Sequence, residues 1–182
     1  VLIQMARNQD GGRADMRAMT EHNFKDAYAG ESQAHMRYLI FSATAEAEGM
    51  PNIARLFKAI AFAEQAHATN HFRALGNIKK TAQNLQTAID GETFEVDEMY
   101  PAYLAVAQLQ DEGAARRSGE WALAAEKIHA AMYRKAKQAA ETGKDTVLQD
   151  VYICPICGHT VEGDAPDKCP ICGTLKAKFV KF

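Results

Sequence analysis

Long hydrophobic runs, clusters of basic residues and prolines are all scarce in this sequence. No apolar stretch approaches the roughly 18 residues that a membrane-spanning helix needs, so we expect no membrane segment and no membrane partner. Lysines and arginines are scattered and the formal net charge is −2, which argues against a nucleic-acid-binding surface. The first residues lack the apolar block and the small-residue cleavage site of a signal peptide, so we expect a cytoplasmic protein.

Cysteine is absent from everything before residue 154. The four cysteines then form two copies of Cys-Pro-Ile-Cys-Gly, at Cys154, Cys157, Cys169 and Cys172. In a reducing compartment such tight pairs favour a metal held by thiolates over disulfides. The spacing suits zinc and iron equally, so by itself it does not distinguish a structural metal from an electron carrier.

Glycine and proline are also sparse within four long segments whose apolar residues recur at helical spacing. The expected helices span residues 20–48, 52–75, 84–112 and 114–141. We expect Thr20 to cap the first helix and Gly49 to end it, with Pro51 at the start of the second. Pro101 is expected to kink or break the third helix, and Gly113 to end it.

The connections between these helices are short, long and short, which favours an all-α four-helix bundle of two hairpins joined by one crossover. After Gly143 the residues become strand-prone and turn-prone, so a second domain begins there. The predicted organisation is an N-terminal extension at 1–19, the bundle at 20–146, and a small, mostly irregular or β, metal-binding domain at 147–182.

The two predicted hairpins repeat one acidic pattern. Each has a glutamate on its first helix and a Glu-x-x-His motif on its second: Glu31 with Glu64 and His67, and Glu92 with Glu126 and His129. Residues three apart lie about 5–6 Å apart on one helix face, so each motif aims a carboxylate and an imidazole at the same point. This is the ligand set of di-iron carboxylate bundles, and its oxygen and nitrogen atoms suit iron or manganese.

A single Glu-x-x-His motif is usually part of a solvated helix face. The matched pair of motifs is what favours a dinuclear metal site here. Glu95 lies three residues after Glu92 and is expected to share its face as a further or bridging ligand. Tyr38 and Tyr100 lie at helical offsets from the ligands. Core packing is the default expectation for each, and these two are the first candidates for a hydrogen bond to a ligating carboxylate.

Five stretches together resemble the rubrerythrins, in which a ferritin-like di-iron bundle precedes a rubredoxin-like domain. They are YAGESQAHMRY, AEQAH, GETFEVDEMYP, AEKIH and the paired CPICG motifs, and the resemblance covers residues 20–182. The resemblance implies that two iron ions are bound by Glu31, Glu64, His67, Glu92, Glu95, Glu126 and His129. It also implies that a third iron, for which zinc can substitute, is bound by Cys154, Cys157, Cys169 and Cys172.

The same resemblance implies an oxidoreductase that protects against oxidative stress by reducing hydrogen peroxide to water. Electrons would be relayed through the four-cysteine iron from a separate reductase that uses NAD(P)H. Glu95 would exchange with His67 as a ligand when the iron changes oxidation state. A homodimer or a higher homo-oligomer is also implied.

Two other functions stay open at this stage. One is a ferroxidase or iron-handling protein, and the other is a non-enzymatic zinc-ribbon adaptor on a structural bundle. One residue departs from the expected pattern, because Gly119 stands inside the last helix where a large apolar residue is expected. We expect it to weaken that helix by about 1 kcal/mol relative to alanine and to leave space or admit a close neighbour.

Overall fold

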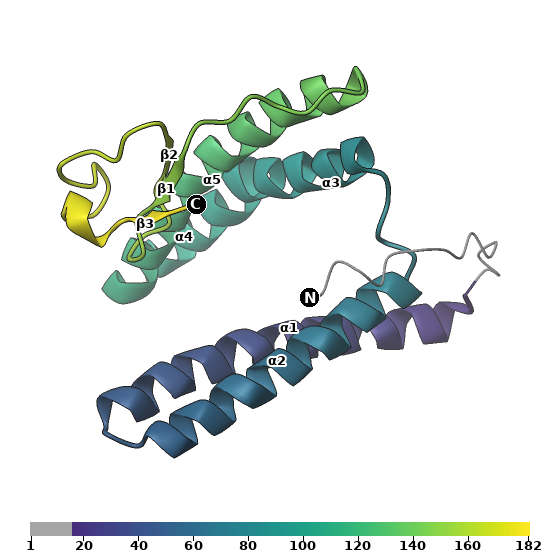
Figure 1. The fold of residues 1–182 in the computed structure, drawn as a ribbon, viewed down its shortest axis with the longest axis horizontal. Helices are drawn as coiled ribbons and strands as arrows, with labels where there is room; N and C mark the ends of the chain where they lie inside the picture. Colours follow the sequence, from purple (N-terminus) through teal and green to yellow (C-terminus); the bar gives the residue numbers. More distant parts are fainter. Residues whose placement is uncertain (1–15) are drawn as a thin grey trace. The chain divides into compact units, whose positions relative to one another are not determined.

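The computed structural model describes residues 16–182 and contains long helices followed by a small strand-containing domain (Figure 1). This confirms the expected fold class, mostly helical with a four-cysteine domain at the C-terminal end. The chain divides into two compact units, one up to Lys79 and one from Lys80 to Phe182. Most of the expected N-terminal extension, residues 1–15, lies outside the described residues.

The first unit is a helical hairpin of α1 (Ala18–Ala47) and α2 (Pro51–Ala74). Gly49 adopts φ +74° between the helices and Pro51 is the first residue of α2, both as expected. The prediction that Thr20 caps α1 is wrong, because the helix begins at Ala18 after Arg17. The polar side chains near residue 20 do not stop the helix from extending one half-turn further back.

Small side chains form the interface of this hairpin. Its buried apolar residues are alanines, apart from Leu75: Ala34, Ala45, Ala54, Ala61 and Ala68. Alanine lets two helix backbones approach closely, and it has the highest helix propensity of all residues. The same interface therefore specifies both the helices and their close packing.

The third predicted helix is interrupted in the second unit. It runs as α3 (Thr81–Phe94), a π-helical segment η2 (Glu95–Met99) and α4 (Tyr100–Leu109). The π segment is closed by a hydrogen bond from the backbone N–H of Tyr100 to the carbonyl of Glu95. Pro101 follows at once, and its ring and missing N–H are incompatible with a regular α-helical turn before it, so the wider turn accommodates it.

The turn into α5 (Gly113–Glu141) differs from the expectation in one respect. Gly113 begins α5 and does not end the preceding helix. The left-handed residue of this turn is Asp111, at φ 56°. Aspartate tolerates that conformation better than most residues because its short side chain hydrogen-bonds locally.

Gly119 admits a close neighbour from α4. A Cβ atom at this position would lie 2.9 Å from Cδ2 of Leu104 and 3.7 Å from Cδ1 of Tyr100. The glycine that weakens α5 therefore allows α4 to pack closely against it.

The C-terminal domain is built on a three-stranded antiparallel sheet in the order β2-β1-β3. The strands are β1 (Val151–Ile153), β2 (Thr160–Glu162) and β3 (Val180–Lys181), with a short 3-10 turn η3 (Lys176–Lys178) before β3. Trp121 of α5 packs against the buried cysteines of this domain. A Cβ atom added to Gly158 would lie 3.7 Å from the Cβ of Ala125. The C-terminal domain therefore lies directly on α5.

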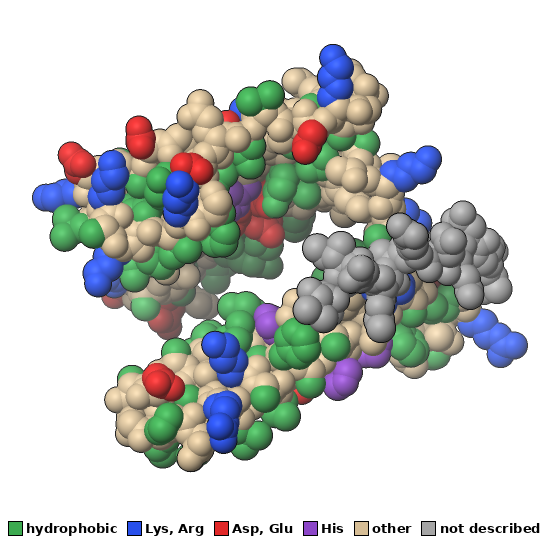
Figure 2. Space-filling view, viewed as in Figure 1, with side chains coloured by type: hydrophobic (Ala, Val, Ile, Leu, Met, Phe, Trp, Pro, Cys, Tyr) green, Lys and Arg blue, Asp and Glu red, His purple; other side chains and the backbone are tan. Residues whose placement is uncertain are grey.

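Charged side chains are dispersed over the face seen in Figure 2, with lysines and arginines interspersed among acidic residues. None of the helices within residues 16–182 combines the length and the apolar character needed to cross a membrane.

Candidate metal centres

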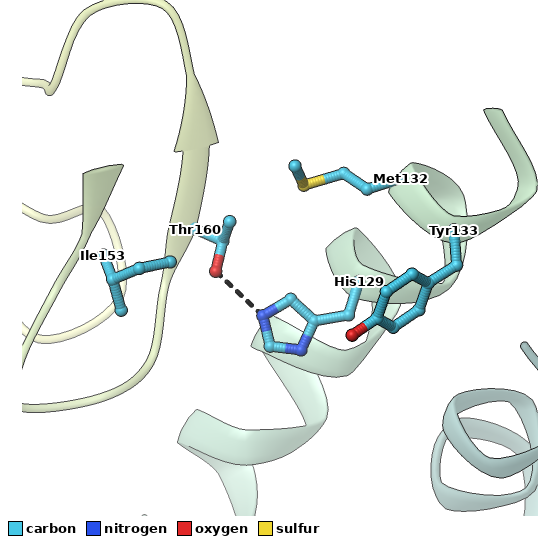
Figure 3. Close-up of a pocket in the computed structure, with 5 residues that line it drawn as sticks. All are labelled: His129, Met132, Tyr133, Ile153 and Thr160. Atoms are coloured by element: carbon cyan, nitrogen blue, oxygen red, sulfur yellow. Dashed lines mark hydrogen bonds between the residues drawn. The ribbon is translucent and has the colours of Figure 1, made fainter. Parts of the chain in front are cut away.

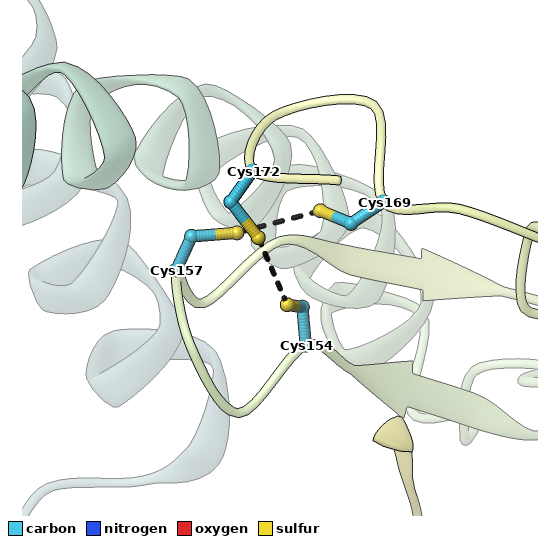
Figure 4. Close-up of side chains that lie close together, drawn as sticks. All are labelled: Cys154, Cys157, Cys169 and Cys172. Atoms are coloured by element: carbon cyan, nitrogen blue, oxygen red, sulfur yellow. Dashed lines mark hydrogen bonds between the residues drawn. The ribbon is translucent and has the colours of Figure 1, made fainter. Parts of the chain in front are cut away.

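The four cysteines converge as the sequence predicts. Cys154 and Cys157 lie on the turn after β1, Cys169 and Cys172 lie on a second turn, and all four sulfur atoms are within 4.8 Å of one another (Figure 4). The Sγ atoms of Cys154 and Cys172 are 3.5 Å apart, as are those of Cys157 and Cys169. All four cysteines are free. A tetrahedral ion with metal–sulfur bonds of about 2.3 Å fits among thiolates at this spacing.

The environment of the sulfur atoms favours the thiolate form at Cys172 and disfavours it at Cys157. Burial raises the pKa of Cys157, although the backbone N–H of His159 opposes this. Burial also acts to raise the pKa of Cys172, but the hydroxyl and backbone N–H of Thr174, with Cys157 and Cys154, outweigh it and lower the pKa to about 6. A buried group of thiols in such contact is stabilised by a cation that takes all four as thiolates.

The first unit brings together Glu31 of α1 with Glu64 and His67 of α2. One ligand atom of each lies within 4.8 Å of the other two. His67 Nδ1 is 2.9 Å from Glu64 Oε2 and 3.8 Å from Glu31 Oε1. Ala61, which is fully buried, precedes Glu64 by three residues and seats this part of α2 against α1.

The second unit brings together Glu92 of α3 with Glu126 and His129 of α5 in the same way. His129 Nδ1 is 2.6 Å from Glu126 Oε2. Burial, a hydrogen bond shared with Glu126, and the charges of Glu126 and Glu95 raise the pKa of Glu92 to about 8. Several half-buried carboxylates held this close repel one another when ionised, and a divalent cation among them removes that cost.

Glu95 lies at the start of η2, near this second group but outside the three ligands that meet within 4.8 Å. Burial and the charge of Glu126 raise the pKa of Glu95, while His129 acts in the opposite direction. The pKa of Tyr100 is raised by burial and by the charges of Glu95, Glu126 and Glu92. Tyr100 therefore lies within electrostatic reach of these carboxylates.

Tyr38 has a different environment. Its ring lies 6.1 Å from that of Phe57 and 6.3 Å from that of Phe41, and these two phenylalanines contact each other edge-on. This aromatic cluster matches the default expectation of core packing for Tyr38.

One contact of the second group joins it to the C-terminal domain. His129 Nε2 lies 2.8 Å from Oγ1 of Thr160, a buried residue of β2. Figure 3 shows the threonine hydroxyl directed at the imidazole, beside a cavity of about 220 Å³ lined by His129, Met132, Tyr133, Ile153 and Thr160. No sequence pattern links Thr160 to α5, because the contact depends on how the C-terminal domain packs.

Two family models match the chain. The rubrerythrin model matches residues 22–137, and the model described as the rubredoxin-like domain of rubrerythrin matches residues 152–180. Each match contains its own metal-binding residues: the two Glu/Glu/His groups lie in the first, and the four cysteines in the second.

Curated relatives match along almost the whole chain. Rubrerythrin-2 of Clostridium acetobutylicum is 46% identical over 179 residues, which cover 91% of this chain and 97% of the relative. Nigerythrin of Nitratidesulfovibrio vulgaris is 32% identical, over 90% of this chain and 86% of the relative.

Solved structures agree with these relatives. Nigerythrin in a partially reduced state and in a fully reduced, all-ferrous state each align with a TM-score of 0.52 at 30% identity, covering 99% of this chain and 96% of the other. The chain has the Glu/His groups of a di-iron site and a rubredoxin-like four-cysteine site, and both family models and the curated relatives match it. This chain therefore belongs to the rubrerythrin family.

Proposed function

We propose that this protein is a peroxidase that reduces hydrogen peroxide to water and so protects against oxidative stress. The observation that supports the proposal best is the presence, in one chain, of two Glu/Glu/His groups and a four-cysteine group. A carboxylate site alone suits several kinds of iron chemistry. An adjoining thiolate site suited to carrying electrons favours a reaction that consumes them.

The donor atoms fit iron in both kinds of site. Carboxylate oxygens and imidazole nitrogens suit the di-iron site, and four sulfur atoms suit the mononuclear one. We assign the di-iron site to Glu31, Glu64, His67, Glu92, Glu95, Glu126 and His129. Iron held by these residues would supply electron transfer, two electrons for each O–O bond at the carboxylate site and one at a time at the cysteine site.

We further assign different roles to the two histidines. His129 contacts Thr160 through Nε2 and Glu126 through Nδ1. The contacts of His67 are made through Nδ1, to Glu64 and Glu31. A ligand that leaves and returns needs a side chain that is free to move, so His67 is the one that exchanges with Glu95. His129 stays in place.

Tyr100 supplies a proton donor in this proposal. Burial and the charges of Glu95, Glu126 and Glu92 raise the pKa of its phenol, so Oη keeps its proton at neutral pH. A protonated phenol beside Glu95 and Glu126 stabilises a carboxylate or an oxygen species by donating a hydrogen bond.

The electrons are proposed to come from a separate reductase that uses NAD(P)H, and the protein is proposed to act as a homo-oligomer. The reductase would meet the chain at the cysteine site, since that site is suited to single-electron delivery.

The test compares the iron-loaded protein with its Cys172→Ser variant. After dithionite reduction, one equivalent of hydrogen peroxide should oxidise the di-iron site of both proteins. Visible absorption spectroscopy measures this oxidation. Continuous turnover with an electron-donor protein should persist only in the wild type. The proposal is wrong if the variant turns over at the wild-type rate. It is also wrong if O₂ oxidises the reduced wild type faster than peroxide does, which would indicate a ferroxidase.

A further inference from the structure

Thr160 joins the C-terminal domain to the proposed di-iron site. It is 4% exposed, and its Oγ1 lies between two partners: 3.0 Å from the carbonyl oxygen of Gly158 and 2.8 Å from Nε2 of His129. Gly158 directly follows Cys157 in the first cysteine turn. A single hydroxyl thus contacts both the backbone of the cysteine site and the imidazole on α5.

The direction of these hydrogen bonds decides which imidazole nitrogen is free. A hydroxyl has one proton to donate, and Thr160 donates it to the Gly158 carbonyl, which can only accept. The oxygen of Thr160 then accepts, so the proton must lie on Nε2 of His129. In the neutral imidazole, which is the form that binds a metal, the remaining nitrogen, Nδ1, then carries the lone pair.

Nδ1 is the atom that faces the carboxylates. It lies 2.6 Å from Glu126 Oε2, and the charge of His129 also acts on the carboxyl of Glu95. Metal-binding histidines commonly donate the N–H of their second ring nitrogen to a protein acceptor, which sets both the tautomer and the orientation of the ring. Thr160 stands where that acceptor is needed.

The place of Thr160 in the fold makes this contact depend on the whole C-terminal domain. Thr160 pairs with Ile153 in the sheet, next to the cysteine turn. The domain also contacts α5 through Trp121 and through an ion pair of 2.9 Å between Lys135 and Glu162. A correctly folded cysteine site on α5 is thus what brings the hydroxyl to His129.

We propose that Thr160 is a positioning residue that holds His129 as the Nε2–H tautomer with Nδ1 directed at the metal. The rubredoxin-like domain thereby forms part of the di-iron site and does not only deliver electrons to it. This inference rests on the proposed role of His129 as a metal ligand.

The experiment uses full-length protein labelled with ¹⁵N-histidine and loaded with Zn²⁺, which is diamagnetic. In the wild type, the His129 Nδ1 signal should shift on zinc binding, and the Nε2–H proton should exchange slowly with solvent because Thr160 accepts it. Thr160→Val keeps the shape and removes the hydroxyl. It should speed that exchange and weaken zinc binding at His129 by about 10–100-fold against a competing chelator.

Three control variants distinguish the effect of the Thr160 hydroxyl from effects of the neighbouring residues. Thr160→Ser should restore wild-type exchange and affinity. Met132→Leu changes another wall of the same cavity, and Lys135→Met removes the ion pair to Glu162, and both should leave the His129 signals unchanged. The absorption spectrum of Co²⁺ bound at the cysteine site reports whether the C-terminal domain is folded in each variant. If Thr160→Val does not fold, Thr160→Ala is used in its place.

The outcomes distinguish this inference from the proposed function. If zinc leaves Nδ1 of His129 unshifted in the wild type, His129 is not a ligand and both proposals are wrong. If zinc shifts Nδ1 but Thr160→Val keeps wild-type affinity and slow exchange, only the role of Thr160 is wrong. If Lys135→Met reproduces the valine variant, docking of the domain matters and the hydroxyl does not, which also overturns the role of Thr160.

Discussion

At the scale of single residues, Glu95 differs from the other proposed ligands. Glu92, Glu126 and His129 meet within 4.8 Å, while Glu95 interacts with them only electrostatically and lies at the start of a π-helical turn. π turns inside helices are frequent at functional sites. A carboxylate held near the site but outside the close group suits a ligand that enters during the reaction.

We therefore predict that Glu95→Ala slows peroxide turnover by about tenfold or more, the size of effect seen when a residue that supports a metal site is lost. The total iron content should fall much less. Iron analysis and steady-state kinetics measure the two effects. Glu98→Ala is the matched control, because Glu98 is an exposed glutamate of the same π segment. Equal turnover of the two variants at full iron loading would contradict the exchange of Glu95 with His67.

Glu162 provides a pH-dependent prediction at the same scale. Its pKa is lowered by hydrogen bonds from Lys135 and from the backbone N–H of Gln149. A depressed carboxyl pKa means that the contact stabilises the fold above the ordinary pKa of glutamate and loses its effect as the pH falls through the folded-state value.

We predict that Lys135→Met raises the pKa of Glu162 toward the ordinary value, measured by NMR titration of the side-chain carboxyl. The acid side of the stability profile should become flatter in this variant. Because the pair is exposed, the change in stability at neutral pH should be small. An unchanged Glu162 pKa would show that the backbone N–H of Gln149, and not Lys135, lowers it.

At the scale of elements, the packing of α4 on α5 depends on Gly119. The added Cβ of an alanine would gain about 1 kcal/mol of helix propensity but would press on Leu104 at 2.9 Å. These two effects oppose each other.

We predict that Gly119→Ala changes the free energy of unfolding by less than about 0.5 kcal/mol in the wild type, because gain and clash offset each other. In a Leu104→Ala background, where the clash is absent, the same substitution should stabilise by about 1 kcal/mol. Urea denaturation of the four proteins in this double-mutant cycle measures the coupling. An identical effect in both backgrounds would show that Leu104 moves away without cost.

The helix boundaries show which element-level features were predictable. Gly49 and Pro51 mark helix ends because their backbone conformations are local properties, and the structure places a turn and a helix start there. Pro101 signalled an irregularity, but its form, a π turn over Glu95–Met99, was missed. A π turn and an α-helical kink relieve the same local conflict, so the choice depends on the packing of the neighbouring helices.

At the scale of the whole molecule, the proposed function gives the cysteine domain two separable roles, folding around a metal and carrying electrons. Zinc satisfies the first, since its tetrahedral thiolate sites stabilise small domains. Zinc has no redox chemistry and cannot satisfy the second.

We predict that placing zinc in the cysteine site while keeping iron in the Glu/His site leaves the thermal unfolding temperature within a few degrees of the iron form. Peroxide turnover should fall to background. Circular dichroism and a coupled assay measure the two properties on the same sample. Unchanged turnover with zinc would show that electrons reach the di-iron site without the cysteines.

The sequence by itself determined the types of the candidate ligands, their helical spacing, the end of the first helix and the start of the second. All of these depend on residues within a few positions of one another. It also predicted the four-cysteine cluster, since each Cys-x-x-Cys turn preorganises its own pair of sulfur atoms. Only the tertiary structure decided the contact between Thr160 and His129 and the close approach of Leu104 to Gly119. Both join residues far apart in the chain, and such contacts follow from how elements pack and leave no periodic pattern in the sequence.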